Sequence, residues 1–254
     1  MRPYQTAAVA AIAVIAPLAG AGTTTTFDFE SLVHGEIVTN QFAPLMTVSA
    51  LNPNRPFDIV AAFDTSLMGT ADPDLEGPPW AGGNLAISDT ETQLGRALII
   101  AENNTGAGDG ILDNPDDEGS RPAGQLIFDF ASKVSLFGFD VVDIEGNVME
   151  FSRLEFFSAG DSIATVGFDE FTNNASSFYD STIVFGDNTA NRISPITADA
   201  LVAAGFADAA SGFDRVIIHA GGSSAYDNIV IPAPSGLLAL AGGWLMLAPT
   251  RRRR

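Results

Sequence analysis

Short β-rich runs, interrupted by clusters of Gly, Asn, Asp and Pro, constrain the fold of this chain more than any other feature. In the tripeptides Phe-Asp-Phe at 27–29 and Phe-Gly-Phe at 137–139, phenylalanine alternates with polar or small residues, as in strands that bury one face. One segment, 197–204, has a helical pattern with Asp199 in its first turn and Gly205 at its end. The segments predicted as strands are 25–30, 36–42, 46–51, 58–63, 96–102, 125–130, 134–142, 148–158, 162–168, 179–185, 215–219 and 225–231.

Strands at this spacing, without alternating helices, predict an all-β fold, an antiparallel β-sandwich of the jelly-roll type. We divide the 254 residues into an N-terminal segment 1–21, one sandwich domain 22–231 and a C-terminal segment 232–254. Two stretches between predicted strands, 53–95 and 103–124, are long and rich in Gly, Pro and Asp. Because loops of this length inside a compact domain are functional or disordered, a site is expected there.

The N-terminus is typical of a secretory signal peptide. Arg2 provides the positive start, residues 7–18 form an uncharged apolar run, and Ala19-Gly20-Ala21 supplies a cleavage site of small residues. A buried helix is the alternative, but residues 7–18 have no polar face. The sequence therefore predicts an exported protein.

The C-terminus combines Pro232 and Pro234, an uncharged and mostly apolar run at 235–250, and four closing arginines. As a helix the run is about 24 Å long, slightly short of a hydrocarbon core of ~30 Å. The arginines are expected to hold this end in the cytoplasm while the acidic body lies outside. These arginines are Arg251, Arg252, Arg253 and Arg254.

This three-part ending resembles the PEP-CTERM protein-sorting signal of Gram-negative bacteria. Ala233 stands where the best-known form of the signal has a glutamate, which leaves the sortase subtype open. The resemblance implies that an exosortase-type membrane transpeptidase removes the tail, and that the protein passes from a transient inner-membrane anchor to the cell surface or extracellular matrix. A simple single-span anchor is the alternative, and in either case the membrane is contacted only through the C-terminal helix.

The body of the chain is strongly acidic. The formal net charge is −19, and all 31 acidic residues lie between Asp28 and Asp227. Such a surface repels phosphate backbones and favours divalent cations, so nucleic acid is excluded as a partner. The chain has no cysteine, which excludes disulfides, thiolate zinc sites and a cysteine nucleophile. Any metal must be held by oxygen or by the two histidines, His34 and His219.

One acidic cluster in the long loops is a candidate Ca²⁺ site. Asp72 and Asp74 flank a proline, which places their carboxylates on a stiff extended turn. Asp64, at the end of a predicted strand, would complete an oxygen cage. The alternative is an acidic loop that is simply solvated.

A second acidic cluster, at 109–118, contains Asp113, Asp116 and Asp117 and offers further Ca²⁺ ligands. Consecutive acids held close together repel one another unless a cation or water screens them. The cluster does not match the EF-hand template, because the required spacing of acids is missing. A third cluster comprises Asp140, Asp143 and Glu145.

Glu30 and Asp227 form a further candidate pair of metal ligands. Glu30 lies at the end of the first predicted strand and Asp227 on the last one. In this respect the body is similar to jelly-roll carbohydrate-binding modules, in which a structural Ca²⁺ commonly joins the first and last strands. The resemblance rests on strand order and implies a Ca²⁺-stabilised sandwich.

Catalytic motifs are not found in the sequence. There is no Gly-x-Ser-x-Gly elbow, no His-Glu-x-x-His motif and no phosphate-binding Gly-rich loop. A glycosidase needs only two carboxylates in a cleft, so a secreted carbohydrate-active hydrolase on a jelly-roll scaffold is the alternative function. Trp80, in an acidic loop, is a candidate for stacking on a sugar, unless it folds back over the core.

The sequence thus predicts a non-enzymatic, exported protein of the cell surface or extracellular matrix. Its expected role is adhesion, matrix structure or polysaccharide binding, with Ca²⁺ as a stabilising ion. The candidate Ca²⁺ ligands are Glu30, Asp64, Asp72, Asp74, Asp113, Asp116, Asp117 and Asp227.

Overall fold

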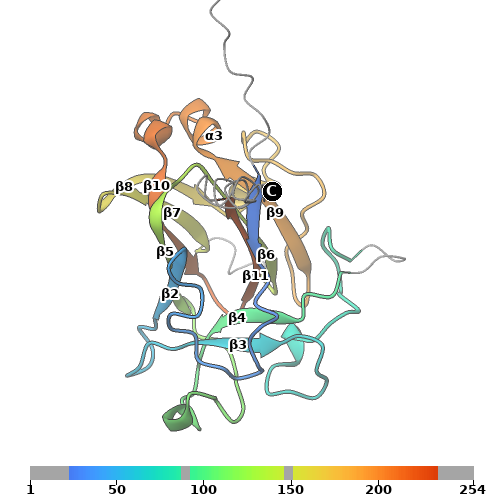
Figure 1. The fold of residues 1–254 in the computed structure, drawn as a ribbon. Helices are drawn as coiled ribbons and strands as arrows, with labels where there is room; N and C mark the ends of the chain where they lie inside the picture. Colours follow the sequence, from blue (N-terminus) through green and yellow to red (C-terminus); the bar gives the residue numbers. More distant parts are fainter. Residues whose placement is uncertain (1–22, 87–91, 146–150, 234–254) are drawn as a thin grey trace, which may run out of the picture.

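The computed structural model describes residues 23–86, 92–145 and 151–233 (Figure 1). The predicted signal peptide, the apolar run 235–250, Pro234 and the four C-terminal arginines lie outside the described residues. Within the described ranges, no helix is both long enough and apolar enough to cross a membrane.

The strands form two antiparallel sheets. The first sheet has the order β3 (Val60–Asp64), β4 (Arg96–Ile100), β11 (Ala225–Pro232), β6 (Leu136–Val142) and β9 (Ala190–Thr197), and β1 (Thr24–Phe27) also pairs with β11. The second sheet has the order β2 (Met46–Leu51), β5 (Gly124–Val134), β10 (Phe213–Ala220), β7 (Arg153–Ser158) and β8 (Asp161–Gly167). The prediction of an all-β sandwich is therefore confirmed.

The last eight strands pair in a nested order. β7 pairs with β8, β6 with β9, β5 with β10 and β4 with β11, each pair antiparallel. Successive nested pairs alternate between the two sheets. β2 and β3 extend the two sheets at the outer edges of β5 and β4.

The main core lies between the two sheets. β2 shows the strict alternation of buried and exposed residues that one-sided burial requires. Phenylalanines fill the centre, where the ring centroids of Phe128 and Phe137 are 5.5 Å apart and those of Phe137 and Phe139 are 5.7 Å apart. The sequence pattern of alternating phenylalanine thus corresponds to inward-facing positions.

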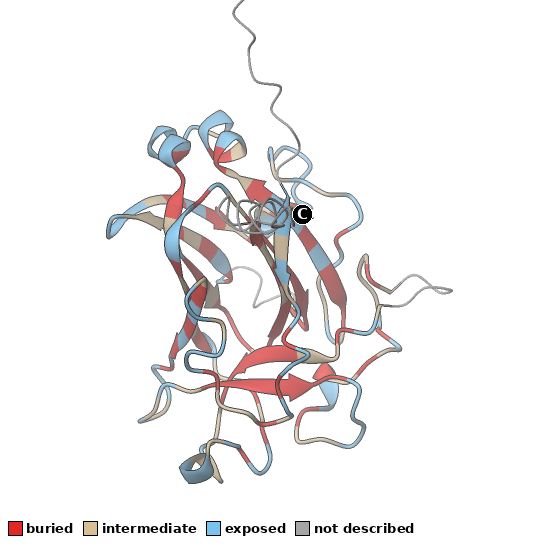
Figure 2. Ribbon diagram, in the orientation of Figure 1, coloured by how far each residue is buried: buried red, intermediate tan, exposed pale blue. Residues whose placement is uncertain are grey.

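A second apolar cluster lies on the outer face of the first sheet. All five residues of β3 are buried, which is possible only when both faces of the strand are covered (Figure 2). The sheet contributes mostly small side chains, such as Ala61, Ala97 and Ala101. The long loops contribute large ones: Leu75, Trp80, Leu85, Leu94 and Leu112. The loops predicted to carry the site therefore form a cover over this sheet.

Within residues 23–86, 92–145 and 151–233, helices are few and short: the 3₁₀ turns η1 (Pro73–Leu75), η2 (Ala107–Asp109) and η3 (Ala207–Ser211), and the α-helices α2 (Asp169–Thr172) and α3 (Ala198–Ala203). The predicted helix at 197–204 is confirmed as α3, with Thr197 as its N-cap. The predicted strand 36–42 is limited to two isolated bridges, at Glu36 and Ile37, and 179–185 contains no strand. β9 was not predicted.

Candidate metal centre

Asp72, Asp116 and Asp117 lie together, although they come from two different long loops. Each offers a carboxylate oxygen, and these oxygens all lie within 4.8 Å of one another. In the described part of the chain, no other group of three acidic or histidine side chains meets this criterion. We call these residues the three-aspartate cluster.

Backbone pairing fixes Asp116 and Asp117 beside the end of β4. Asp117 forms an isolated bridge with Ala101. The amide of Glu118 donates to the carbonyl of Ile100 at 2.8 Å, and the amide of Glu102 donates to the carbonyl of Asp116 at 2.9 Å. Residues 116–118, in the loop 103–124, therefore extend the first sheet beside β4.

Asp72 is positioned by the 3₁₀ turn η1 that follows it. Pro73 starts the turn, where its missing N–H is not needed. Leu75, at the end of the turn, is fully buried in the second apolar cluster. The burial of Leu75 thus draws the preceding carboxylate against Asp116 and Asp117.

The hydrogen bonds of the cluster leave one buried oxygen without a partner. Asp117 accepts from the amide of Ser224 and from the Oγ of Ser223, the latter at 3.1 Å. Asp72 is 7% exposed, and its Oδ2 has no hydrogen-bond partner among the described residues. None of the ion pairs within those residues involves the three-aspartate cluster. The cluster is therefore rich in negative charge and poor in donors.

The electrostatic consequence appears in the pKa values. Burial, and then the charge of Asp72, raises the pKa of Asp116 to about 6. Burial, and then the contact with Asp72, raises the pKa of Asp117 well above its ordinary value. Ionised carboxylates are costly here, so the cluster is stabilised either by protons or by a cation. Carboxylate oxygens are the ligands that Ca²⁺ and Mg²⁺ prefer, so the donor set fits a hard divalent cation.

Two further acids border the cluster. Burial, followed by Asp187, Asp72 and Glu145, raises the pKa of Asp74. Burial is also the main reason that the pKa of Asp143 is raised to about 7, although the amide of Asn188 donates to its Oδ1 at 2.8 Å. When ionised, Asp74 adds to the negative potential at Asp72, with which it interacts electrostatically.

Two other predicted ligands are placed elsewhere. Asp64 forms an ion pair with Arg96 and accepts hydrogen bonds from the amide and hydroxyl of Ser66, at 3.0 and 2.6 Å. Asp113 is exposed and lies outside the three-aspartate cluster. Each of the two acidic clusters predicted in the long loops therefore contributes only some of its acids to the three-aspartate cluster.

Glu30 and Asp227 are near enough to interact electrostatically. Glu30 is exposed, and its Oε1 accepts from the amide of Arg96 at 2.7 Å. Asp227 is fully buried, with no hydrogen-bond partner for its Oδ1 among the described residues. Burial, followed by Asp140, Glu30 and Asp28, raises its pKa to about 9. These residues do not form a group with the ligand spacing of the three-aspartate cluster.

Trp80 and the two histidines serve packing and hydrogen bonding. Trp80 is 5% exposed in the second apolar cluster, and its Nε1 donates to the carbonyl of Thr92 at 2.9 Å. Trp80 therefore folds back over the core, which was the alternative to a role in stacking on a sugar. The Nδ1 of His34 accepts from the amide of Asp64 at 3.0 Å, and the Nε2 of His219 lies 2.8 Å from the Oε2 of Glu155.

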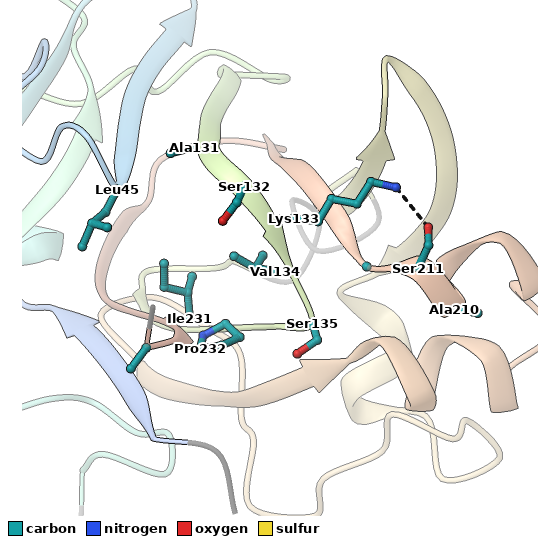
Figure 3. A pocket seen from close by; sticks show the side chains of 12 residues that line it. Leu45, Ala131, Ser132, Lys133, Val134, Ser135, Ala210, Ser211, Ile231 and Pro232 are labelled. Carbon is teal, nitrogen blue, oxygen red and sulfur yellow. Dashed lines mark hydrogen bonds between the residues drawn. The ribbon is translucent and has the colours of Figure 1, made fainter. Parts of the chain in front are cut away.

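A cavity of about 430 Å³ lies at a different part of the domain, where the end of β5 meets the end of β11 (Figure 3). Its lining includes one charged side chain, Lys133, whose Nζ donates to the Oγ of Ser211 at 3.1 Å. None of the described residues that line it carries a carboxylate or an imidazole. The cavity therefore does not add to the candidate metal centre.

Sequence reasoning missed Ser223 and Ser224, which hold Asp117 in place. They lie in the short connection between β10 and β11, more than a hundred residues from Asp117. No local signal marks this connection as part of an acidic site. Only the nested strand order places the β10–β11 connection beside the loop 103–124.

No family model matches the chain, and no curated protein does. Among solved structures, the chain is similar to the K2 cleaved adhesin domain of Lys-gingipain, with 14% sequence identity and a TM-score of 0.39. The match covers 83% of this chain and 100% of that one. A likeness at this level carries no argument about the present chain.

Proposed function

We propose that this protein is an exported, non-enzymatic β-sandwich of the cell surface or extracellular matrix, stabilised by Ca²⁺. Its role is adhesion, matrix structure or polysaccharide binding. In this proposal segment 1–21 directs export, and an exosortase-type transpeptidase processes segment 232–254, as the resemblance to a sorting signal implies. The observation that carries the proposal is the buried carboxylate of Asp72, which faces two further carboxylates and has an oxygen without a partner.

The strand order supports a jelly roll as the scaffold. In a jelly roll a long antiparallel hairpin is folded over, so its strand pairs are nested and alternate between two sheets. The pairs β7–β8, β6–β9, β5–β10 and β4–β11 follow this order. A rigid scaffold of this kind presents its loops at fixed positions, as a binding protein requires.

A divalent cation is proposed because no cationic side chain among the described residues pairs with the three carboxylates when they are ionised. Two unit charges at 4 Å repel by about 4 kcal/mol at an effective dielectric constant near 20. Asp72 faces two such neighbours at ligand distance. A cation between them converts this repulsion into attraction. Ca²⁺ is favoured over Mg²⁺ because it accepts irregular sets of six to eight oxygen ligands, whereas Mg²⁺ demands a regular octahedron.

Thermal unfolding of the full-length chain tests the proposal. We expect Ca²⁺ at about 100 times its Kd to add about 2.7 kcal/mol relative to EGTA, and to raise Tm by roughly 5–11 °C. Mg²⁺ is the control for plain charge screening. Asp72→Asn should abolish the Ca²⁺ response, whereas Asp208→Asn, at an exposed position, should leave it unchanged. A response that is absent, or that Mg²⁺ matches, would refute the Ca²⁺ site.

A further inference from the structure

Residues 65–77, which we call the Asp72 loop, form a small unit with a narrow neck. At the neck, the amide of Gly77 donates to the carbonyl of Thr65 at 2.8 Å. Inside the loop, the Oε1 of Glu76 accepts from the amide of Thr70 at 2.6 Å and from its hydroxyl at 2.8 Å. These bonds lie within the loop, so the loop can move as one body about its neck without breaking them.

At the neck the amide of Thr65 also donates to the carbonyl of Gly95 at 2.8 Å, but few contacts fasten the rest of the Asp72 loop to the domain. Leu75 inserts into the second apolar cluster. The Nδ2 of Asn188 donates to the carbonyls of Asp74 and Glu76, both at 2.9 Å. The remaining buried side chain in the tip of the loop is that of Asp72, which faces the carboxyl groups of Asp116 and Asp117 and whose Oδ2 has no hydrogen-bond partner among the described residues.

The two sides of the three-aspartate cluster differ in how firmly they are held. Asp116 and Asp117 belong to the scaffold, through the backbone bonds to β4 and through the bonds from Ser223 and Ser224. Asp72 belongs to a loop that can pivot. Without a cation, the repulsion between the carboxylates of the cluster that are ionised acts to push the loop away from the sheet. With a cation bound between them, its attraction to all three carboxylates holds the loop against the sheet.

We propose that the three-aspartate cluster is a cation-operated latch that holds the Asp72 loop closed over the second apolar cluster. The inference rests on the proposed Ca²⁺ site and adds a regulatory role to it. Loss of the cation frees the loop, withdraws Leu75 and exposes part of the apolar outer face of the first sheet. The protein thus presents a different surface at low and at high Ca²⁺.

Hydrogen exchange of the full-length chain, followed by mass spectrometry, tests the latch. Peptides covering residues 65–77 are compared in EGTA and in Ca²⁺ at about 100 times its Kd. If the ion binds only the closed loop, exchange there should slow by up to about 100-fold. Peptides from β5, in the main core, are the internal control: they exchange only through global unfolding and should stay protected in both conditions over the times at which the loop exchanges. Calorimetric titration of the same sample with Ca²⁺ establishes binding independently.

Two variants separate the latch from simple stabilisation. Asp72→Asn removes the charge that repels the loop, so exchange should be slow in EGTA and insensitive to Ca²⁺. Leu75→Ala keeps all three carboxylates but weakens the closed state, so exchange should be faster in EGTA and still slow when Ca²⁺ is added. Asp116→Asn, at a partly exposed position, is the second charge variant should Asp72→Asn fold poorly.

The outcomes distinguish the two proposals. Ca²⁺ binding in the calorimeter with unchanged exchange at 65–77 would overturn the latch and leave the Ca²⁺ site standing. No Ca²⁺ binding at all would overturn the Ca²⁺ site and the latch with it. Slower exchange confined to the Asp72 loop, and lost in Asp72→Asn, would support both.

Discussion

Asp227→Asn should change how the stability of this protein depends on pH. Asp227 is fully buried on β11, and its Oδ1 has no partner among the described residues. Burial raises its pKa from an ordinary value of 3.8 to about 9. At neutral pH the folded state therefore holds a proton that the unfolded chain releases. The stabilising contribution is present below pH 4 and is lost as the pH rises toward 9.

The magnitude follows from one proton per molecule. Between the two pKa values, stability falls by about 1.4 kcal/mol for each pH unit, which is about 2.7 kcal/mol from pH 6 to pH 8. Asparagine at this position stays neutral, and its side-chain oxygen can keep the hydrogen bond that the Nδ2 of Asn228 donates at 2.8 Å. The difference in unfolding free energy, native protein minus Asp227→Asn, should therefore decrease by about 2.7 kcal/mol between pH 6 and pH 8.

Urea denaturation in EGTA at pH 6, 7 and 8 measures this difference, provided that the m-values agree. Other buried acids, such as Asp143, contribute equally to both proteins and cancel in the comparison. Asp208→Asn, at an exposed position, is the matched control and should show a constant difference. A constant difference for Asp227→Asn as well would show that Asp227 is ionised in the folded state, and would refute the reasoning.

Two further predictions concern the scaffold. Phe137→Ala should lower the free energy of unfolding by about 3–5 kcal/mol in urea, because the ring is fully buried against Phe128 and Phe139; a loss below 1 kcal/mol would contradict the assigned core. Thr197→Ala should cost about 1 kcal/mol, because the Oγ1 of Thr197 caps α3 by accepting from the amide of Ala200 at 3.0 Å, whereas Thr197→Ser should retain most of that stability.

Strands with clear alternation were predictable, and those that failed have identifiable causes. The predicted strand 46–51 coincides with β2. β9 escaped prediction because it contains Pro195, which argues against a strand in a sheet interior; β9 lies at the edge of the first sheet, where a missing N–H is tolerated. In 179–185, Asp180 accepts from the amide and hydroxyl of Thr182, at 2.8 and 2.6 Å, and this local turn replaces the extended conformation.

The site was predictable residue by residue but not as a group. All three aspartates of the cluster were candidates, because loop acids next to prolines or to one another are typical cation ligands. Their assembly depends on which loops meet above the first sheet, which follows from strand order. Asp64 is a candidate from sequence because it lies at the end of a predicted strand, where its carboxylate would complete an oxygen cage. Its neighbour across β3 and β4 is Arg96, and this becomes visible only once the register is known.

The position of β11 has a consequence for how the molecule folds. β11 is the last strand among the described residues, yet it lies inside the first sheet, between β4 and β6, and it also pairs with β1. Until residues 225–232 arrive, β3 and β4 have no neighbour through which they can join β6 and β9. The first sheet can therefore be completed only when residues 225–232 are available, through contacts between segments distant in sequence. A topology dominated by contacts between segments distant in sequence is expected to slow folding.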